Sequence, residues 1–323
     1  MKRLNCRIER WDANGDFIEW DFITEIEINS SWAEFTETAK LTFPNKIQYK
    51  NKPIVNGDES IFKRGDNIEI FLGYDDTIIS EFSGYITKII PGVPIVLECE
   101  NEAFLLKQKT IKKLSFKSVT LKELLTAIIP DGIPVVSPDA KLGAFRITNA
   151  TSMQVLDELK KTYGFPAFFR NGTLYVGQTY VGALRETHVV EFENDVISSD
   201  LEYKRKEDLK IKVKAISMLE DNTKIEIETG DDDGELRTLT FYNITSETEL
   251  EKIALAELDR LKFDGYAGSF EMFGQPTIQH QHVVEIIDGK FPERSGEYFV
   301  KSHGVTFGQS GFRRNIELGT KSL

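Results

Sequence analysis

The amino-acid sequence predicts a mainly β protein in which two similar antiparallel β-barrel-like domains flank a small α+β module. Residues 62–106 alternate apolar and polar side chains in short runs, and Gly, Asp or Pro interrupts each run at hairpin distance. The alternation returns over residues 187–320, whereas residues 118–180 show helical spacing behind capping residues. Because period-two patterns with frequent turns are typical of small barrels and sandwiches, both flanking regions are predicted as β domains.

The chain divides where this pattern changes. A lysine-rich stretch precedes the α+β module and is predicted as a solvated connector rather than a binding patch. A helix is expected late in the chain, where Ser246 and Glu249 match a capping box. The predicted domains are 1–106, the first β-barrel domain; 107–117, the connector; 118–180, the α+β module; and 181–323, the second β-barrel domain with one helix near 246–262.

Two capping boxes and one hairpin signal define the α+β module. Thr120 with Glu123, and Thr151 with Gln154, place a hydroxyl three residues before a side chain that returns a hydrogen bond. Apolar residues follow both pairs at helical spacing, which predicts two helices. Asn171-Gly172 separates two apolar runs, and this dipeptide is a strong signal for a tight hairpin.

An internal echo predicts that the two β domains are duplicates. Residues 68–71 read Ile-Glu-Ile-Phe and are followed by Gly-Tyr-Ile-Thr-Lys at 84–88. Residues 284–287 read Val-Glu-Ile-Ile and are followed by Glu-Tyr-Phe-Val-Lys at 297–301. A repeat of this kind indicates two similar units in one chain.

One strand pair of the second domain is expected to carry complementary charges. Lys210, Lys212 and Lys214 alternate with apolar residues, and Glu226 and Glu228 do the same after a polar turn. Antiparallel pairing would place lysines beside carboxylates on the solvent face. Each such pair contributes about 0.2–1 kcal/mol.

The amino-acid composition limits the classes of function that the chain can have. The 323 residues include 40 basic and 52 acidic ones, and this net charge of −12 disfavours nucleic-acid binding, which needs clustered cations. Cys6 and Cys99 fall at apolar positions and are expected to be buried thiols, as in a reducing cytosol. The N-terminus lacks the apolar core of a signal peptide, and no run approaches about 18 apolar residues, so no membrane insertion is expected.

The search for reactive residues predicts no catalytic, cofactor or metal site. His280 and His282 would share one face of a strand, with Glu271 as a third ligand, but such pairs usually bind nothing and no HExxH motif accompanies them. The acidic run 231–233 lacks calcium-loop spacing and favours a solvated turn. No Gly-x-Ser-x-Gly elbow occurs. The chain is therefore predicted not to be an enzyme.

Aromatic and basic residues are the remaining candidates for a binding surface. The loops 291–296 and 307–314 combine them, a composition that is enriched at protein interfaces and is also found in ordinary turns. The lysine row of the second domain is a further candidate. The candidate interface residues are Lys210, Lys212, Lys214, Phe291, Arg294, Phe312, Arg313 and Arg314.

Motifs in the same order along most of the chain resemble the baseplate hub proteins of contractile phage tails. This family includes the tail protein of Mu-like phages, the late control protein D group and the hub part of type VI secretion spike proteins. The first matching pieces are Phe62–Asp66 and Phe82–Thr87. Phe145–Asn149, Gly172–Gly177 and Gly311–Arg314 follow in the expected order.

The resemblance implies a structural, non-catalytic virion protein without a cofactor. Such hubs are homotrimers in which each chain gives two similar β-barrel domains. Six barrels then match a sixfold tail tube above and a threefold spike below. The implied partners are other copies of this chain, a tail tube protein and a central spike protein, in a phage or prophage baseplate assembled in the host cytoplasm.

Three alternatives stay open on the sequence. The same motifs fit a hub in a type VI-like contractile injection system. A peptidoglycan or other carbohydrate hydrolase on a β scaffold would need a cleft with two carboxylates about 5–9.5 Å apart. A metal-binding module at His280 and His282 is the third alternative.

Overall fold

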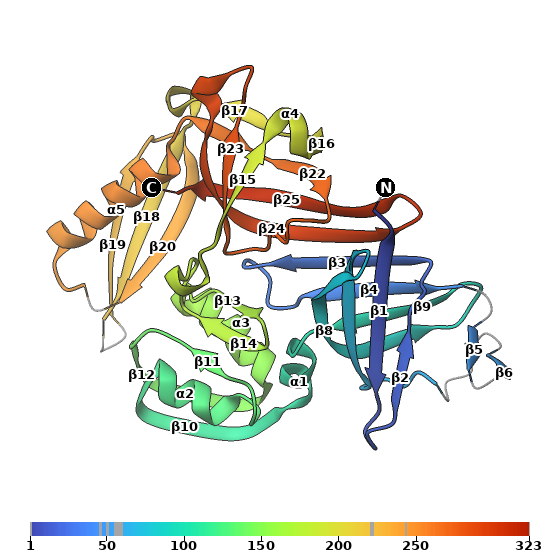
Figure 1. Ribbon diagram of the computed structural model, residues 1–323. Helices are drawn as coiled ribbons and strands as arrows, with labels where there is room; N and C mark the ends of the chain where they lie inside the picture. The colour runs from blue at the N-terminus through green and yellow to red at the C-terminus, as the bar shows by residue number, and fades with distance from the viewer. Residues whose placement is uncertain are drawn as a thin grey trace.

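The computed structural model describes residues 2–44, 47–49, 52–54, 61–219, 223–242 and 244–322. The protein is mainly β with several largely antiparallel sheets, which confirms the predicted fold class. Figure 1 shows the N-terminal strands in blue on one side, a green α+β module below them, and yellow to red strands above and beside that module. No helix among the described residues is long and apolar enough to span a membrane.

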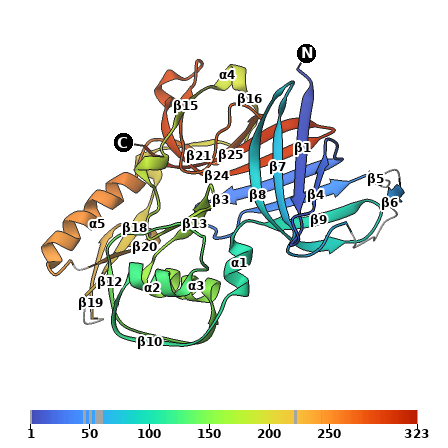
Figure 2. The same ribbon diagram turned by 60° about the horizontal axis from the view of Figure 1, so that its bottom comes forward.

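The first part of the chain forms an antiparallel β unit around its own core. Hydrogen bonds connect its strands in the order β3-β4-β9-β8-β7-β1-β2, and Figure 2 shows β8, β7 and β1 side by side. Cys6 and Cys99 are buried free thiols in this core, as predicted. The strands are β1 (Leu4–Trp11), β2 (Phe17–Trp20), β3 (Glu25–Ser31), β4 (Thr38–Phe43), β5 (Ile47–Tyr49), β6 (Lys52–Ile54), β7 (Asn67–Tyr74), β8 (Thr77–Ile90) and β9 (Ile95–Glu100).

The α+β module contains both predicted capping boxes. The side chains of Thr120 and Thr151 accept hydrogen bonds at the starts of α2 and α3, and the reciprocal bonds are present. Asn171 (φ 49°) and Gly172 (φ 72°) both have positive φ, which is what a tight Asn-Gly hairpin requires. The elements are α1 (Ala103–Gln108), β10 (Thr110–Thr120), α2 (Leu121–Ile128), β11 (Val135–Val136), β12 (Lys141–Thr151), α3 (Ser152–Tyr163), β13 (Ala167–Arg170) and β14 (Thr173–Val176).

The stretch predicted as a connector, residues 107–117, differs from that prediction. It holds the end of α1 and most of β10, which pairs antiparallel with β12. The physical reason is that Ile111, Leu114 and Phe116 pack against the core of the module. The lysines between them belong to a strand rather than to a linker.

The last part of the chain contains a second β unit and a separate small layer. The layer is the sheet β19-β18-β20 with helix α5 packed on it around its own core, and Ser246 caps this helix as predicted. Its elements are β18 (Ile211–Met218), β19 (Lys224–Gly230), β20 (Glu235–Tyr242) and α5 (Glu247–Leu261). The second β unit has β15 (Thr187–Glu191), α4 (Phe192–Asp195), β16 (Val196–Ser199), β17 (Glu202–Lys204), β21 (Gly265–Ala267), β22 (Ser269–Phe273), β23 (Val283–Ile287), β24 (Gly296–Gly308) and β25 (Gly311–Lys321).

The two β units share one sheet. Strand β24 pairs antiparallel with β3 over seven residue pairs, from Ser302–Ser31 to Gly308–Glu25, so the described strands of both units form a continuous 13-stranded sheet. Figure 1 shows β24 lying along β3 between the two units. The far end of the β24–β25 hairpin also supplies Val305, Phe307 and Phe312 to the core of the first unit.

The two units have the same strand order, although β15 runs parallel to β23 whereas β1 runs antiparallel to β7. The first runs β3-β4-β9-β8-β7-β1, and the second runs β16-β22-β25-β24-β23-β15. The long strands β8 and β24 both shift register midway, between Ile86 and Lys88 and between Val300 and Ser302. Equivalent residue pairs follow from this match. The row Ile26–Leu41–Leu97–Ile89 in the first unit corresponds to Ser199–Phe270–Ile316–His303 in the second.

Replacing Phe312 by alanine should destabilise the whole β sheet. Phe312 is fully buried and its ring lies 5.8 Å from that of Phe307 and 5.5 Å from that of Tyr74. The cavity left by Phe312→Ala should lower the unfolding free energy by about 3–5 kcal/mol in urea denaturation. The matched control is Phe273→Ala, which removes a side chain 49% exposed on a neighbouring strand and should change stability by about 0.5 kcal/mol or less. Equal losses in the two variants would contradict a shared core.

Candidate functional site

All four histidines of the chain lie where its three main parts meet. His188 comes from β15, His280 and His282 from the loop between β22 and β23, and His303 from β24. His188 is half-buried and the other three are buried. The rings of His280 and His303 stack 5.8 Å apart, and those of His188 and His282 stack 5.1 Å apart. We call these four side chains the histidine cluster.

Arg170, at the end of β13 in the α+β module, fixes the proton positions in one half of the cluster. Its Nη2 lies 3.2 Å from Nε2 of His282, and a guanidinium can only donate, so this imidazole nitrogen accepts. The proton of His282 is therefore on Nδ1, which donates to Nε2 of His188 at 3.0 Å. The result is a directed hydrogen-bond chain from Arg170 through His282 to His188.

The loop 280–282 attaches the α+β module and the linker after it to the second β unit. The imidazole of His280 hydrogen-bonds the backbone of Phe169 and lies edge-on to Phe168 at 5.4 Å. Gln281 donates from Nε2 to the carbonyl of Thr179 at 2.7 Å and accepts from the amide of Val181 at 2.9 Å. Three consecutive buried side chains thus hold one segment, and we call residues 280–282 the clasp loop.

The structure corrects the predicted placement of His280 and His282. They lie in a turn before β23 and do not share one face of a strand. The reason is Gln281, whose φ of 78° breaks the extended conformation that period-two alternation assumes. His280 consequently faces His303, whereas His282 faces His188.

One group near the cluster has the spacing of metal ligands. Potential metal-ligand atoms of Glu186, His188 and His282 lie within 4.8 Å of one another, a spacing compatible with ligands of one metal ion. A ligating imidazole normally donates its second N–H to an acceptor, but the neighbour of His282 on that side is the donor Arg170. The polarity of this contact favours the hydrogen-bond chain over a metal centre.

A fully buried ion pair joins the two β units beside the cluster. Arg314 on β25 and Glu81 on β8 both have 0% side-chain exposure, and Nη2 lies 2.5 Å from Oε1. Arg314 also donates to the carbonyls of Gly274 and Ile278, at 3.1 and 3.2 Å, so each of its nitrogens has an acceptor. Such satisfaction is required because an unpaired buried charge is very costly.

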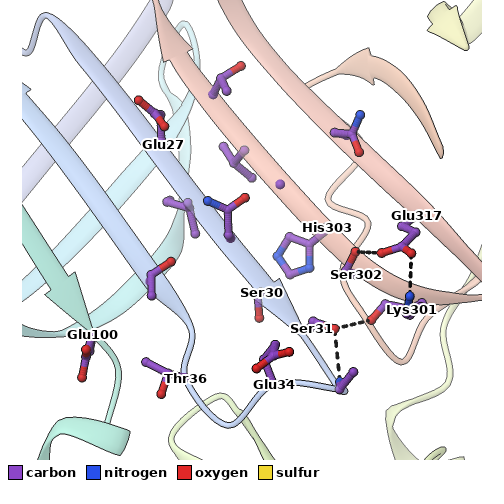
Figure 3. A pocket seen from close by; sticks show the side chains of 18 of the residues that line it. Glu27, Ser30, Ser31, Glu34, Thr36, Glu100, Lys301, Ser302, His303 and Glu317 are labelled. Atoms are coloured by element: carbon purple, nitrogen blue, oxygen red, sulfur yellow. Dashed lines mark hydrogen bonds and ion pairs between the residues drawn. The ribbon is translucent and has the colours of Figure 1, made fainter. Parts of the chain in front are cut away.

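A polar groove of about 770 Å³ lies over the junction of β3 and β24. Figure 3 shows Glu317 beside Lys301 and Ser302 in this groove. Burial acts to raise the pKa of Glu317, but hydrogen bonds from Lys301 and Ser302, both 2.6 Å, outweigh it and leave the pKa below its ordinary value. Glu100 is likewise paired with Lys107 at 2.6 Å. A carbohydrate hydrolase needs one carboxyl with a raised pKa, and the lowered pKa of Glu317 does not meet that need.

The candidate interface residues fall into three groups. Two lysines of the row pair with the acidic strand as predicted: Lys214 lies 2.7 Å from Glu226 and Lys212 lies 3.2 Å from Glu228. Lys210 instead pairs with Asp233 in the turn before β20. Phe291 is 44% exposed, with the guanidinium of Arg294 3.9 Å above its ring. Arg313 is half-buried over the ring of Phe273 at 5.0 Å.

Phe312 and Arg314 are not surface residues, which corrects their prediction as interface candidates. Both are fully buried, Phe312 in the core of the first unit and Arg314 in the ion pair with Glu81. The alternation of β25 turns these two side chains inward and Arg313 outward. Of the loop 307–314, Arg313 keeps its place among the candidates.

Sequence reasoning did not find Arg170, Glu81 or Glu37, although the four histidines were visible. Glu37 precedes β4 near Arg170, and burial raises the pKa of this carboxyl to about 8. Each of these residues comes from a different element and is joined to the cluster only by the fold. The one available signal was the scarcity of histidine, since all four copies meet at one place.

Comparison with solved structures places this fold among tail proteins. The tail protein of Neisseria meningitidis MC58 matches with a TM-score of 0.65 at 16% identity, over 98% of this chain and 97% of that one. The 43 kDa tail protein of prophage MuSo2 from Shewanella oneidensis matches with a TM-score of 0.63 at 17% identity, over 97% and 98%. An Escherichia coli type VI secretion component, described as structurally similar to T4 tail proteins, matches at 0.55 and 8%, over 93% and 74%.

The chain has the fold of phage tail proteins. The resemblance drawn from its motifs is thereby confirmed at the level of the fold. No protein-family model and no curated protein sequence matches it. The match to the two tail proteins spans nearly the whole of each chain, so it includes both β units and the module between them.

Breaking the buried ion pair should be far more harmful than removing it. Arg314→Met leaves the carboxylate of Glu81 buried without its cation and should lower the unfolding free energy by about 3–5 kcal/mol. The double variant Glu81→Met/Arg314→Met removes both charges and should be more stable than Arg314→Met alone. Urea denaturation of the two single variants and the double variant measures this coupling. Additive losses would show that the pair is not a unit.

Stability should fall as the pH drops below the ordinary pKa of histidine. Burial is the main cause that lowers the pKa of His280 and of His282 to about 3, and it also lowers the pKa of His188 and of His303. Unfolded histidines therefore take up protons below about pH 6.5 that the folded chain does not bind, so their contribution is present above that pH and is lost towards pH 3.

The raised pKa of Glu37 works in the opposite direction. The folded chain keeps this proton up to about pH 8, so its contribution is present at low pH and lost as the pH rises through 8. Burial also raises the pKa of Glu81 and of Glu102, which act in the same sense as Glu37. Because the four histidines outnumber these three carboxyls, the unfolding free energy should be about 1–3 kcal/mol lower at pH 5 than at pH 7. Urea titrations at the two pH values measure this, and equal values would contradict neutral histidines in the folded cluster.

Proposed function

We propose that the protein is a structural component of a phage or prophage tail baseplate, the homotrimeric hub that joins the tail tube to the central spike. The fold it shares with tail proteins supports a structural role. The observation that carries the hub proposal is the duplicated β unit together with the way the two copies join. In this proposal the chain catalyses no reaction and resides in the virion baseplate.

The junction inside the chain leaves two matching free edges. In the second unit, β24 pairs with β23 up to Phe299 and with β3 from Ser302 onward. In the first unit, β8 pairs with β7 up to Tyr85, but no described strand pairs with that side of residues 87–90. On the other unit, the outer edges of β16 and β17 have no strand partner among the described residues. These edges correspond to the β24 and β3 edges that meet inside the chain.

Joining β16 and β17 of one copy to β8 of the next would repeat the internal junction between chains. Such a contact is heterologous, and closed rings form when its rotation closes. Three chains would then give a ring of six similar units, which suits a sixfold tube and a threefold spike. Exposed strand edges also promote aggregation, so a partner for them is expected on general grounds.

Phe291, which is exposed, and Arg294 and Arg313, which are half-buried, remain proposed contact residues for the tube or the spike. The lysine row Lys210–Lys214 is proposed with them, although its ion pairs already neutralise much of its charge within the chain. The likeness to an Escherichia coli type VI secretion component favours a hub of a contractile injection system as the second candidate. The genes next to this one, phage tail or secretion system, distinguish the two.

The purified protein should be a trimer. Mass photometry and light scattering at micromolar concentration measure the mass directly, against 36.8 kDa for one chain. A strict monomer over this range would contradict the hub proposal. A dimer would contradict the six-unit ring while leaving the fold assignment intact.

A cysteine pair tests the proposed edge contact. Asn29 faces Gly304 inside the chain, and the equivalent positions on the free edges are Glu202 and Ile90. The variant Glu202→Cys/Ile90→Cys should form disulfides between copies under mild oxidation, seen as covalent dimers and trimers on non-reducing gels. Cys6 and Cys99 are buried and should not compete. The control Glu202→Cys/Thr77→Cys puts the second thiol at the far end of β8 and should stay monomeric; equal cross-linking of both variants would refute this edge contact.

A further inference from the structure

The contacts of the clasp loop depend on neutral imidazoles. Nε2 of His282 accepts from Arg170, and Nδ1 of His303 accepts from the backbone amide of His280 at 3.0 Å. A protonated imidazole has donors on both nitrogens and can accept neither bond. Protonation of His282 would also place a cation against the guanidinium of Arg170. Two of the contacts that hold the loop in place would thus be lost by gaining a proton.

The charged groups around the cluster make added protons costly. Arg170 from β13 and Arg314 from β25 are the cations that face it, and both disfavour protonated histidine. Among the carboxylates, Glu81 on β8 is engaged by Arg314, and Glu186 before β15 is exposed with Oε1 3.5 Å from His188.

The remaining titratable groups act on Arg170 rather than on the imidazoles. Glu37 before β4 is half-buried and attracts the guanidinium, and Tyr175 on β14 contributes in the same sense. Glu102, before α1, acts on Glu37. No carboxylate among these faces His280 or His303 closely enough to be paired with it in a described hydrogen bond or ion pair.

We propose that the histidine cluster is a proton-sensitive clasp: protonation in mild acid opens the clasp loop and releases the linker 177–183 that it holds. The ligand of this site is the proton, and all residues of the clasp belong to one chain. The inference therefore goes beyond the hub proposal and does not depend on the trimer.

The opening is expected to be local because each part has its own core. The module packs around one apolar cluster, and the two β units pack around two others. The β3–β24 ladder joins the β units through backbone hydrogen bonds that do not titrate. In contrast, His280, Gln281 and His282 join the hairpin and linker by side-chain contacts. The β13–β14 hairpin also contributes Ala167, Phe169, Leu174 and Val176 to the core of the module, whereas none of the residues 177–183 belongs to a core cluster of the described chain. The linker 177–183 should therefore open at lower cost than the strands.

Hydrogen exchange followed by mass spectrometry tests the proposal on the full chain. Exchange is measured at about pH 7.5 and about pH 5 and corrected for the intrinsic effect of pH on the chemical rate. Peptides covering the linker 177–183 should exchange about tenfold faster or more at the lower pH, because open histidines bind protons that closed ones exclude. Peptides covering β8 and β9 should show little change.

Two histidine variants and one control test whether protonation of the histidines causes the faster exchange at low pH. His282→Gln keeps an acceptor for Arg170 and a donor for His188 but cannot take up a proton, so most of the acid effect should disappear. His303→Gln serves as the second test if the first variant folds poorly. Glu186→Gln removes the carboxylate beside His188 while leaving every histidine in place, and the acid effect should persist.

The proposal is overturned by any of three results: no acceleration in the wild-type chain, equal acceleration in the β8 and β9 peptides, or full acceleration in both histidine variants. The second result would mean global acid unfolding rather than a clasp. Acceleration that is confined to the linker 177–183, lost with the histidines and kept in Glu186→Gln supports it. None of these outcomes bears on the oligomeric state, so the hub proposal stands or falls separately.

Discussion

The pairing of β24 with β3 is the constraint on which the rest of this structure depends. It turns two β units into one sheet and carries the end of the β24–β25 hairpin into the core of the first unit. The same placement brings Arg314 from the second unit to Glu81 of the first. It also sets the corner against which the α+β module rests. A slip of one residue in this register would move Arg314 and Phe312 to the opposite face, so the ladder, the core and the ion pair fix one another.

The buried polar groups at this corner are better explained by their effect on the specificity of packing than by a contribution to the free energy of unfolding. Burying charges costs free energy that their mutual attraction only partly offsets, and apolar replacements of such pairs are often as stable. An apolar corner, however, would tolerate several ways of packing the module against the sheet. Arg170, Glu81 and Arg314 each need a particular hydrogen-bond acceptor or donor. These needs are met in only one packing of the module against the sheet. In a protein whose proposed work is to hold a ring in register, one fixed arrangement has an evident use.

Local patterns predicted much of the fold and little of the site. Alternation and turn residues gave the strand-rich units, and the capping boxes at Thr120 and Thr151 gave two helix starts, because these signals act within a few residues. Arg314 was taken for a surface residue because arginine is rarely fully buried, and only pairing with a strand far back in the chain reverses that expectation. The alternation around His282 suggested a strand, but the positive φ of Gln281 depends on tertiary contacts. Nothing local marks the β24–β3 pairing, which brings Arg314 and Glu81 together.

The duplicated units also differ in a way that matters for assembly. Where the second unit has His303, the first has Ile89, and where the second has the buried Arg314, the first has Ile95. The junction within the chain therefore borders a buried polar cluster, whereas the equivalent edge of β8 carries the half-buried Ile89 and Ile90 beside Thr87 and the exposed Lys88. If copies join at that edge, the two kinds of junction have the same strand geometry but different chemistry. Apolar burial suits a contact that must form between separate chains, since it gains free energy without requiring each charge to find one partner. The polar junction forms within one chain as that chain folds. It can therefore contain buried titratable groups, which would weaken a contact between separate chains.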